Sequence, residues 1–172
     1  MASEILVTGS NGQLGSELVA ALKQAGQSVV GVDLPEFDLS NRCSVTDVIQ
    51  ITQPKVVLHT AAYTDVDRAE SDQDRVWQVN VEGTRAVAQA CRNTGARLIY
   101  YSTDYVFDGA KGSAYTETDI PNPVSVYGKS KLAGEELVTE AVENHLIMRT
   151  AWLYGKKGKN FVRAMLRLAQ QQ

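Results

Sequence analysis

Short apolar runs alternate along the chain with longer segments in which apolar residues recur every three or four positions. Five runs have the length and residue types of strands, and they cover residues 5–8, 28–32, 56–60, 97–102 and 145–150. Helical spacing between them is carried by Leu14, Leu18 and Leu22, by Val76, Asn80, Gly83 and Val87, and by Leu132, Leu137 and Ala141. Residues 45–51 show a weaker helical pattern and residues 160–170 an amphipathic one. The alternation predicts an α/β fold.

Strands that are separated by helices are joined by right-handed crossovers, which favours a doubly wound parallel sheet of the Rossmann type. Ligands of such sheets bind at the carboxyl ends of the strands. The one long irregular stretch, residues 103–123, begins there, directly after the fourth strand. A loop of that length is commonly functional, so we expect part of the site in it.

Composition limits the partners and the location. With 172 residues, 44% of them hydrophobic and 22% charged, the chain has the size and composition of one globular domain. A formal net charge of -3 gives no general attraction to nucleic acid or to an anionic membrane surface. Because we find no run of about 18 apolar residues and no signal segment, we expect a cytoplasmic protein without membrane contact. Cys43 and Cys91 are far apart and lack paired histidines, so neither a disulfide nor a metal site is predicted.

The segment VTGSNGQLGSELV follows the first strand and carries glycines at positions 9, 12 and 15. Glycine permits a tight turn and a close approach of backbone to a pyrophosphate, and a helix that starts near Gly12 points free amides at that charge. A glycine turn made only for packing is the alternative, but the place of this turn after the first strand favours dinucleotide binding. The residues expected to contact the cofactor are Gly9, Asn11, Gly12, Gln13, Leu14 and Gly15.

Asp33 ends the second strand, where an acidic side chain can accept hydrogen bonds from the adenosine ribose hydroxyls. Its charge favours NAD, because it would repel a 2′-phosphate and the nearby cation, Arg42, is nine residues further on. NADP remains open, and so does a role for Asp33 as a solvated strand end only. Asp38 and Leu39 are candidates to flank the adenine or are ordinary loop residues.

Ala61, Ala62 and Tyr63 follow the third strand and are expected to line the cofactor groove, where small side chains let adenosine and ribose approach. Asn80 faces inward among apolar neighbours. A buried amide needs a partner, so we expect Asn80 either to bond the backbone or to order the loop after the third strand.

Tyr127 and Lys131 lie four residues apart in VYGKSKLAGEELV, and therefore on one face of a helix that starts near Ser125. A free tyrosine has a pKa of about 10, and a neighbouring ammonium lowers that pKa by favouring the phenolate. We therefore expect Lys131 to tune Tyr127 as a proton donor. A surface lysine beside a packed aromatic is the alternative.

The order of TGSNGQLG, STDYVFDG and YGKSK resembles the extended short-chain dehydrogenase/reductases that act on nucleotide sugars. Within them, STDYVFDG, AAYTDVDRAE (residues 61–70) and RTAWLYG (residues 149–155) resemble the dTDP-4-dehydrorhamnose reductases. The resemblance implies that residues 1–172 are an NAD(P)-binding Rossmann domain. It also implies that a later substrate-binding lobe is missing, so we expect a fragment that binds dTDP-sugar poorly.

The resemblance also implies roles for three side chains. Thr103 takes the place of the hydroxyl that hydrogen-bonds the substrate carbonyl, Tyr127 donates the proton, and Lys131 also holds the nicotinamide ribose. A donor aimed at the developing alkoxide and a placed general acid suit this chemistry.

On the substrate side, the related sugar dehydratases carry a glutamate at the position of Tyr105, which favours plain ketone reduction here. Asp104 and Tyr105 are expected to contact substrate, although capping and packing are the alternatives. Trp152 offers a flat apolar face for the deoxysugar or packs in the core. The lysine-rich loop 155–160, which ends at Asn160, either receives the substrate diphosphate or is merely solvated.

The activity implied is NAD(P)H-dependent reduction of the 4-keto group of dTDP-4-dehydro-6-deoxy-L-mannose (dTDP-4-dehydrorhamnose) to dTDP-L-rhamnose. One alternative is a non-catalytic module, like the regulatory subunit of methionine adenosyltransferase, which resembles the same reductases. Another is a nucleotide-sugar epimerase that keeps NAD bound. The sequence leaves a homodimer open.

Overall fold

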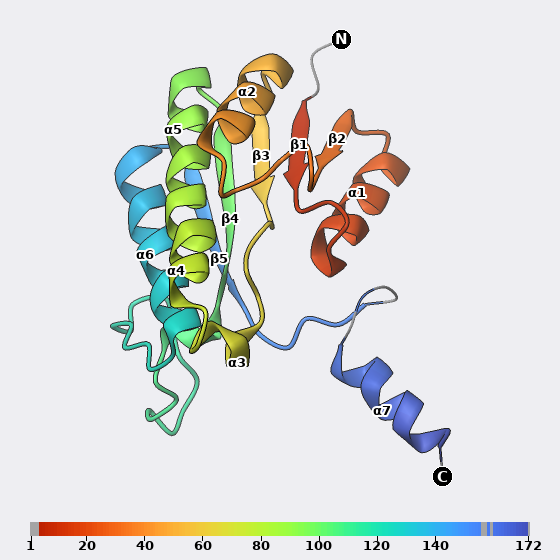
Figure 1. The fold of residues 1–172 in the computed structure, drawn as a ribbon, viewed down its shortest axis with the longest axis vertical. Coiled ribbons are helices and arrows are strands. Elements are labelled where there is room, and N and C mark those ends of the chain that lie inside the picture. The colour runs from red at the N-terminus through yellow and green to blue at the C-terminus, as the bar shows by residue number, and fades with distance from the viewer. Residues whose placement is uncertain (1–3, 156–157, 159, 172) are drawn as a thin grey trace.

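The computed structural model contains one sheet of five parallel strands in the order β2-β1-β3-β4-β5 (Figure 1). The structure describes residues 4–155, 158 and 160–171. The strands are β1 (Ile5–Thr8), β2 (Val29–Val32), β3 (Val56–His59), β4 (Arg97–Thr103) and β5 (His145–Thr150). All five strands expected from the apolar runs are confirmed, with ends that differ by no more than one residue.

Helices cover both faces of the sheet. They are α1 (Gln13–Gln24), α2 (Arg42–Thr52), α3 (Val66–Ala69), α4 (Gln73–Trp77), α5 (Thr84–Thr94), α6 (Val126–Ala141) and α7 (Phe161–Ala169), with a 3₁₀ turn η2 (Asp104–Val106). Because crossovers are right-handed and the strand order reverses after β2, α1 lies on one face and α2, α5 and α6 on the other (Figure 1). The fold is therefore the doubly wound, Rossmann-type arrangement expected.

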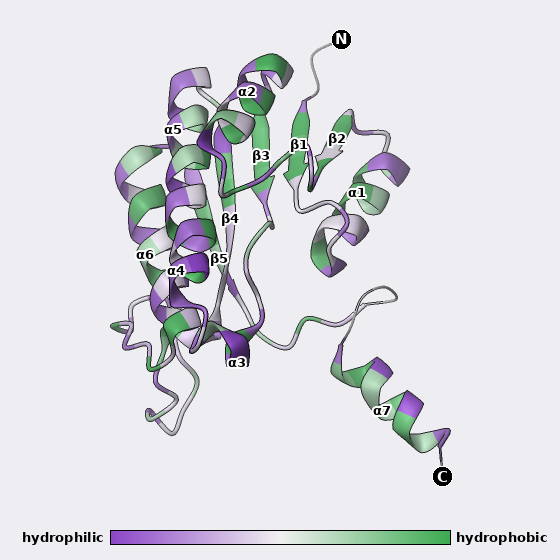
Figure 2. Cartoon of the chain, viewed as in Figure 1, coloured by the Kyte–Doolittle hydropathy of each residue, from purple (hydrophilic) through white to green (hydrophobic). Residues whose placement is uncertain are grey.

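The main core lies between the sheet and the layer of α2, α5 and α6. Leu6, Val57 and Leu98 of the central strands pack with Ile49 of α2 and Val87 of α5, and all five side chains are fully buried. Figure 2 shows the apolar residues of β1 and β3 at the centre and more hydrophilic residues along α5. Burial of these side chains supplies the main favourable free energy of folding.

The edge near β5 is less covered. Leu146 and Met148 are 42% and 40% exposed, whereas Ile147 on the other face packs against the core. Helix α7 lies away from the sheet in Figure 1 and exposes Phe161 and Leu166. None of the described helices is long and apolar enough to span a membrane.

The segment expected to form one helix through Val76 and Val87 is wound in three parts, α4, the π-helix η1 (Gln78–Gly83) and α5. Positions 76, 80, 83 and 87 are all buried. The prediction that these residues form the inward face of the segment is therefore confirmed, although the winding is not uniform. Short π segments within α-helices often lie at functional sites.

Asn80 sits in this π segment and is almost fully buried. Its Oδ1 accepts a hydrogen bond from the Tyr63 N–H at 2.8 Å, and its Nδ2 donates to the Tyr63 carbonyl at 3.1 Å and to Ser130 Oγ at 3.0 Å. Both uses expected of the amide, a backbone partner and the ordering of the loop after β3, are therefore met. The same side chain also holds that loop against α6.

We predict that Asn80→Ala lowers the free energy of unfolding by about 3 kcal/mol, because it leaves the Tyr63 peptide groups without their partner. Urea unfolding followed by circular dichroism measures the change. The matched control is Gln78→Ala, an exposed position in the same π segment, which should stay within about 0.5 kcal/mol of the wild type. Equal losses in the two variants would contradict the role of the Asn80 amide.

Candidate active site

A cavity of about 650 Å³ opens at the carboxyl ends of all five strands. Residues from each strand end line it, together with the start of α1 and one face of α6. The expected residues that line it are Gly9, Asn11, Gly12, Gln13, Leu14, Gly15, Asp33, Asp38, Leu39, Ala61, Ala62, Thr103, Asp104, Tyr105, Tyr127, Lys131 and Trp152. The structure thus brings together residues that are more than 140 positions apart in the sequence.

At one end of the cavity, the glycine turn packs backbone directly on backbone. Gly9 has a φ of +67°, and a Cβ there would lie 2.8 Å from the Ala61 backbone. A Cβ at Gly15 would overlap the Gly9 carbonyl oxygen. Gly12 is the N-cap of α1 and has no side chain to cap it, so the free amides at the start of that helix face the cavity. This cradle fits a pyrophosphate.

Asp33 braces the same turn. Its Oδ2 accepts a hydrogen bond from the Asn11 N–H at 2.7 Å, and its Oδ1 accepts one from the Leu34 N–H at 2.8 Å. Asp38 is held by Ser40, whose side-chain and backbone hydrogen bonds lower the pKa of the carboxyl. Leu39 is buried against Gly83. The two backbone hydrogen bonds show that Asp33 is more than a solvated strand end.

At the other end, Thr103 and Tyr127 meet. Thr103 is the last residue of β4, and Tyr127 lies in the first turn of α6, which begins after the N-cap Ser125 as expected. Burial raises the pKa of the Tyr127 phenol, and a hydrogen bond with the Thr103 side chain opposes that rise. The expected lowering of this pKa by Lys131 is wrong for this structure, since the net shift is upward and the Lys131 ammonium lies over Tyr100 instead.

Two of the expected residues do not line the cavity. The Tyr63 side chain packs beside Ala69, Val76 and Val126, and its hydroxyl donates to Asp72 at 3.4 Å. Asn160 caps α7 through the Arg163 N–H and donates to the Gly155 carbonyl.

Trp152 and the loop 155–160 are the remaining expected positions. Trp152 is largely exposed at the cavity edge, with a positive φ of 52° and an edge-on contact with Phe161. Core packing, the alternative for Trp152, is therefore wrong. The lysines of the 155–160 loop, at positions 156, 157 and 159, lie outside the described residues.

Several lining residues escaped the sequence patterns. Arg75 and Lys131 are the two cations among the described residues that line the cavity, and Arg75 was not expected there. Ser102 carries a buried hydroxyl for which the described residues offer no hydrogen-bond partner. The sequence offered only weak signs of these two residues, because Ser102 lies near the end of a strand and Arg75 on a short helix. Many residues without a function share such positions.

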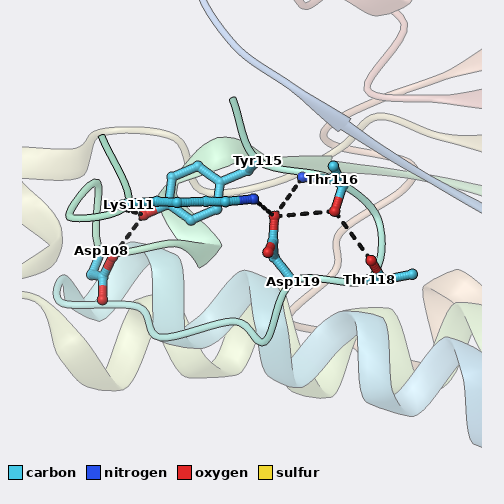
Figure 3. Close-up of polar contacts among 6 residues, drawn as sticks. All are labelled: Asp108, Lys111, Tyr115, Thr116, Thr118 and Asp119. Atoms are coloured by element: carbon cyan, nitrogen blue, oxygen red, sulfur yellow. Dashed lines mark hydrogen bonds and ion pairs between the residues drawn. The ribbon is translucent and has the colours of Figure 1, made fainter. Parts of the chain in front are cut away.

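The loop that follows the strand end STDYVFDG is tied by two carboxylates (Figure 3). Asp108 accepts hydrogen bonds from the Ala110 N–H, the Tyr115 hydroxyl and the Asn122 amide at 2.7 to 2.9 Å. Asp119 binds the Lys111 ammonium and Thr116 at the other side of the Tyr115 ring. The Tyr115 ring also stacks on Phe107 at a centroid distance of 4.2 Å. These contacts tie residues 107–122 into one ordered loop, whereas the cavity is lined by Thr103, Asp104 and Tyr105 at the start of the long stretch.

A family model described as RmlD substrate binding domain matches residues 3–172. The chain belongs to this family. The RmlD match covers almost the entire sequence, including the glycine turn, the end of β4 and the start of α6.

Known proteins extend the comparison. The dTDP-4-dehydrorhamnose reductase of Burkholderia thailandensis is 46% identical over 98% of this chain and 56% of its own length. A crystal structure of the Bacillus anthracis dTDP-4-dehydrorhamnose reductase in complex with NADP superposes with a TM-score of 0.96 at 42% identity, over 100% of this chain and 61% of that one. The UDP-glucose 4-epimerase of Thermus thermophilus, in complex with NAD, gives a TM-score of 0.83 at 27% identity, over 90% of this chain and 57% of that one. The chain thus spans a little over half the length of these relatives.

We predict that Gly15→Ala abolishes binding of NADH and NADPH, because the new methyl group would push α1 away from the Gly9 carbonyl. Isothermal titration calorimetry measures the binding, and the amide spectrum reports whether the fold persists. Gly155→Ala is the matched control, since its Cβ would have no neighbour closer than 3.7 Å. Wild-type affinity in Gly15→Ala would contradict the cradle.

We predict that Asp108 titrates at about pH 2, because hydrogen bonds from Ala110, Asn122 and Tyr115 hold its pKa below the ordinary value near 3.9. Since the pKa is lowered in the folded state, the contribution to stability is complete above about pH 4 and is lost as the pH falls through about 2. The carboxyl ¹³C shift measured against pH gives the midpoint. Asn122→Ala should move that midpoint upward, and an unchanged midpoint would contradict the assignment.

Proposed function

We propose that this chain is the cofactor-binding and catalytic part of an NAD(P)H-dependent reductase of a dTDP-sugar. The proposed reaction reduces the 4-keto group of dTDP-4-dehydro-6-deoxy-L-mannose to give dTDP-L-rhamnose. The observation that carries this proposal is the meeting of the Thr103 and Tyr127 hydroxyls in the cavity that the glycine turn closes at its other end. The names of the similar reductases support it.

The residues at the glycine turn fit a dinucleotide. Backbone amides at the start of α1 would hold the pyrophosphate, where Gly9 and Gly15 leave no side chain in the way. Asp33 would accept from the adenosine ribose, and Ala61 and Ala62 would line the groove with small side chains. When bound, a reduced nicotinamide supplies the hydride.

Tyr127 suits the part of a general acid in a reduction. Burial raises the pKa of the phenol, which keeps the proton on the oxygen at neutral pH but makes the phenol a weaker acid. The transfer is still favourable because the forming alkoxide is far more basic than a phenolate. Thr103 is buried at the end of β4, and its hydroxyl would share the carbonyl oxygen with the phenol. Tyr105 lies edge-on to Tyr127 at 5.8 Å and offers no carboxylate for an elimination.

Both cofactors are proposed. Asp33 disfavours a 2′-phosphate by its charge, but the carboxylate already accepts two backbone hydrogen bonds and Arg75 lines the same cavity. The similar Bacillus anthracis reductase is in complex with NADP and the similar epimerase with NAD. Competitive titration of the two reduced cofactors decides between them.

We predict that Tyr127→Phe lowers the turnover of dTDP-4-dehydrorhamnose by a factor of at least about 100 while NADPH affinity stays within about twofold. Turnover is followed as loss of absorbance at the reduced nicotinamide band, on this chain and on a version extended to the length of its relatives. Tyr154→Phe, an exposed tyrosine, is the control. Unchanged turnover in Tyr127→Phe would rule out the assigned acid.

The same experiment separates the alternatives. An extended chain that binds the cofactor but turns over no dTDP-sugar would select a binding module. Retention of NAD through the cycle, without exchange with free NADH, would select an epimerase. Equal turnover by the two lengths would contradict the expectation that this chain alone binds the sugar poorly.

A further inference from the structure

Lys131 occupies an unusual place for a lysine. Its side chain is 3% exposed, and its Nζ lies 4.0 Å from the centroid of the Tyr100 ring. Burial lowers the pKa of the ammonium to about 7, although the nearby carboxylate of Glu135 opposes that shift. A lysine in this position loses its charge near neutral pH unless its neighbours favour the protonated form.

The Tyr100 ring is held so that its face, and not its hydroxyl, meets the ammonium. The side chain is fully buried at the centre of β4, and its hydroxyl donates to the Lys131 carbonyl oxygen at 3.5 Å. Gly134 leaves room for that hydroxyl, since a Cβ there would overlap the oxygen. Burial raises the pKa of the Tyr100 phenol, so the ring stays neutral and attracts the cation through its π electrons.

Glu135 lies one turn along α6 from Lys131 and is 4% exposed. Arg149 of β5 holds its carboxylate by two parallel hydrogen bonds, from Nε to Oε1 at 3.0 Å and from Nη2 to Oε2 at 2.6 Å. This bidentate pairing fixes the carboxylate in a buried position. The guanidinium in turn lies 5.0 Å from the Phe107 ring, in the loop that follows β4.

The other titratable groups around Lys131 do not replace this pair. His59 of β3 is fully buried, and desolvation lowers its pKa to about 3, so it is neutral at pH 7. Tyr127, one turn before Lys131, keeps its proton because burial raises its pKa. Asp104 acts on Tyr127 from the 3₁₀ turn after β4. Glu135 is therefore the anion on α6 that acts on Lys131.

We propose that Tyr100 and Glu135 are positioning residues for Lys131, the ring by holding the ammonium through a cation–π contact and the Arg149-bound carboxylate by keeping it protonated. This deepens the proposed function and rests on it only for the role of Lys131 at the nicotinamide ribose, which the family resemblance implies. Arg149 also contacts the loop after β4, through the Phe107 ring.

The titration of Lys131 tests the proposal without any turnover. In the whole chain labelled with [ε-¹³C]lysine, the Lys131 signal is assigned by its loss in Lys131→Met and is followed against pH. The wild-type midpoint is expected at about 7. Tyr100→Leu and Glu135→Gln are each expected to lower it by about one unit, whereas Tyr100→Phe, which keeps the ring, should leave it within about 0.3 units.

Each outcome has a meaning. Midpoints within about 0.3 units of the wild type in both Tyr100→Leu and Glu135→Gln overturn the proposal. If the Lys131 midpoint shifts in Glu135→Gln but not in Tyr100→Leu, the role of the ring is overturned. If the midpoint shifts as much in Tyr100→Phe as in Tyr100→Leu, the Tyr100 hydroxyl and not the cation–π contact holds the ammonium. Amide spectra verify the fold. Should Tyr100→Leu fail to fold, Tyr100→Met replaces it as the variant without a ring, because methionine adapts to irregular core space. Absence of dTDP-sugar turnover in the extended chain without substitutions, with the expected midpoint shifts present, would speak against the proposed function only.

Discussion

The structure depends on one close approach of backbone to backbone. Gly9, at the end of β1, lies against the backbone of Ala61 after β3, and Gly15 lies against the Gly9 carbonyl. With no side chain between them, the ends of two central strands and the start of α1 form a single rigid corner. The position of the cavity-facing amides of α1 relative to β3 and β4 follows from that corner, and so does the distance from these amides to Thr103 and Tyr127.

The opposite end of the site is built by burying charge. Helix α6 supplies core residues such as Val138 and also carries Tyr127, Lys131 and Glu135. Each buried polar group there has a partner from another element, Thr103 for Tyr127, Tyr100 for Lys131 and Arg149 for Glu135. A low dielectric makes these contacts strong and makes any missing partner costly. The same buried contacts of α6 therefore determine both the protonation of the site residues and the stability of the helix.

Local patterns were enough to predict the sheet, most helices and the glycine turn, because each depends on residues close in sequence. The π winding of η1 was missed because the buried face repeats at 76, 80, 83 and 87 whether the turns are α or π. Tyr63 was misplaced because its ring packs beside Val76 and Val126, which follow it by 13 and 63 residues in the sequence. No prediction was made for Glu135, since nothing near it in the sequence indicates that Arg149 of β5 binds its carboxylate.

Gly134 and Tyr100 constrain each other, because a Cβ at position 134 would overlap the Tyr100 hydroxyl oxygen. Because Gly134 faces the Tyr100 hydroxyl, the tyrosine and the glycine are a single choice made at two positions. A descendant that gains a methyl group on the helix must first shorten the aromatic residue on the strand. In evolution, the change at Tyr100 should therefore come before any change at Gly134. A design that transfers the Lys131 environment to another scaffold has to include both Tyr100 and Gly134.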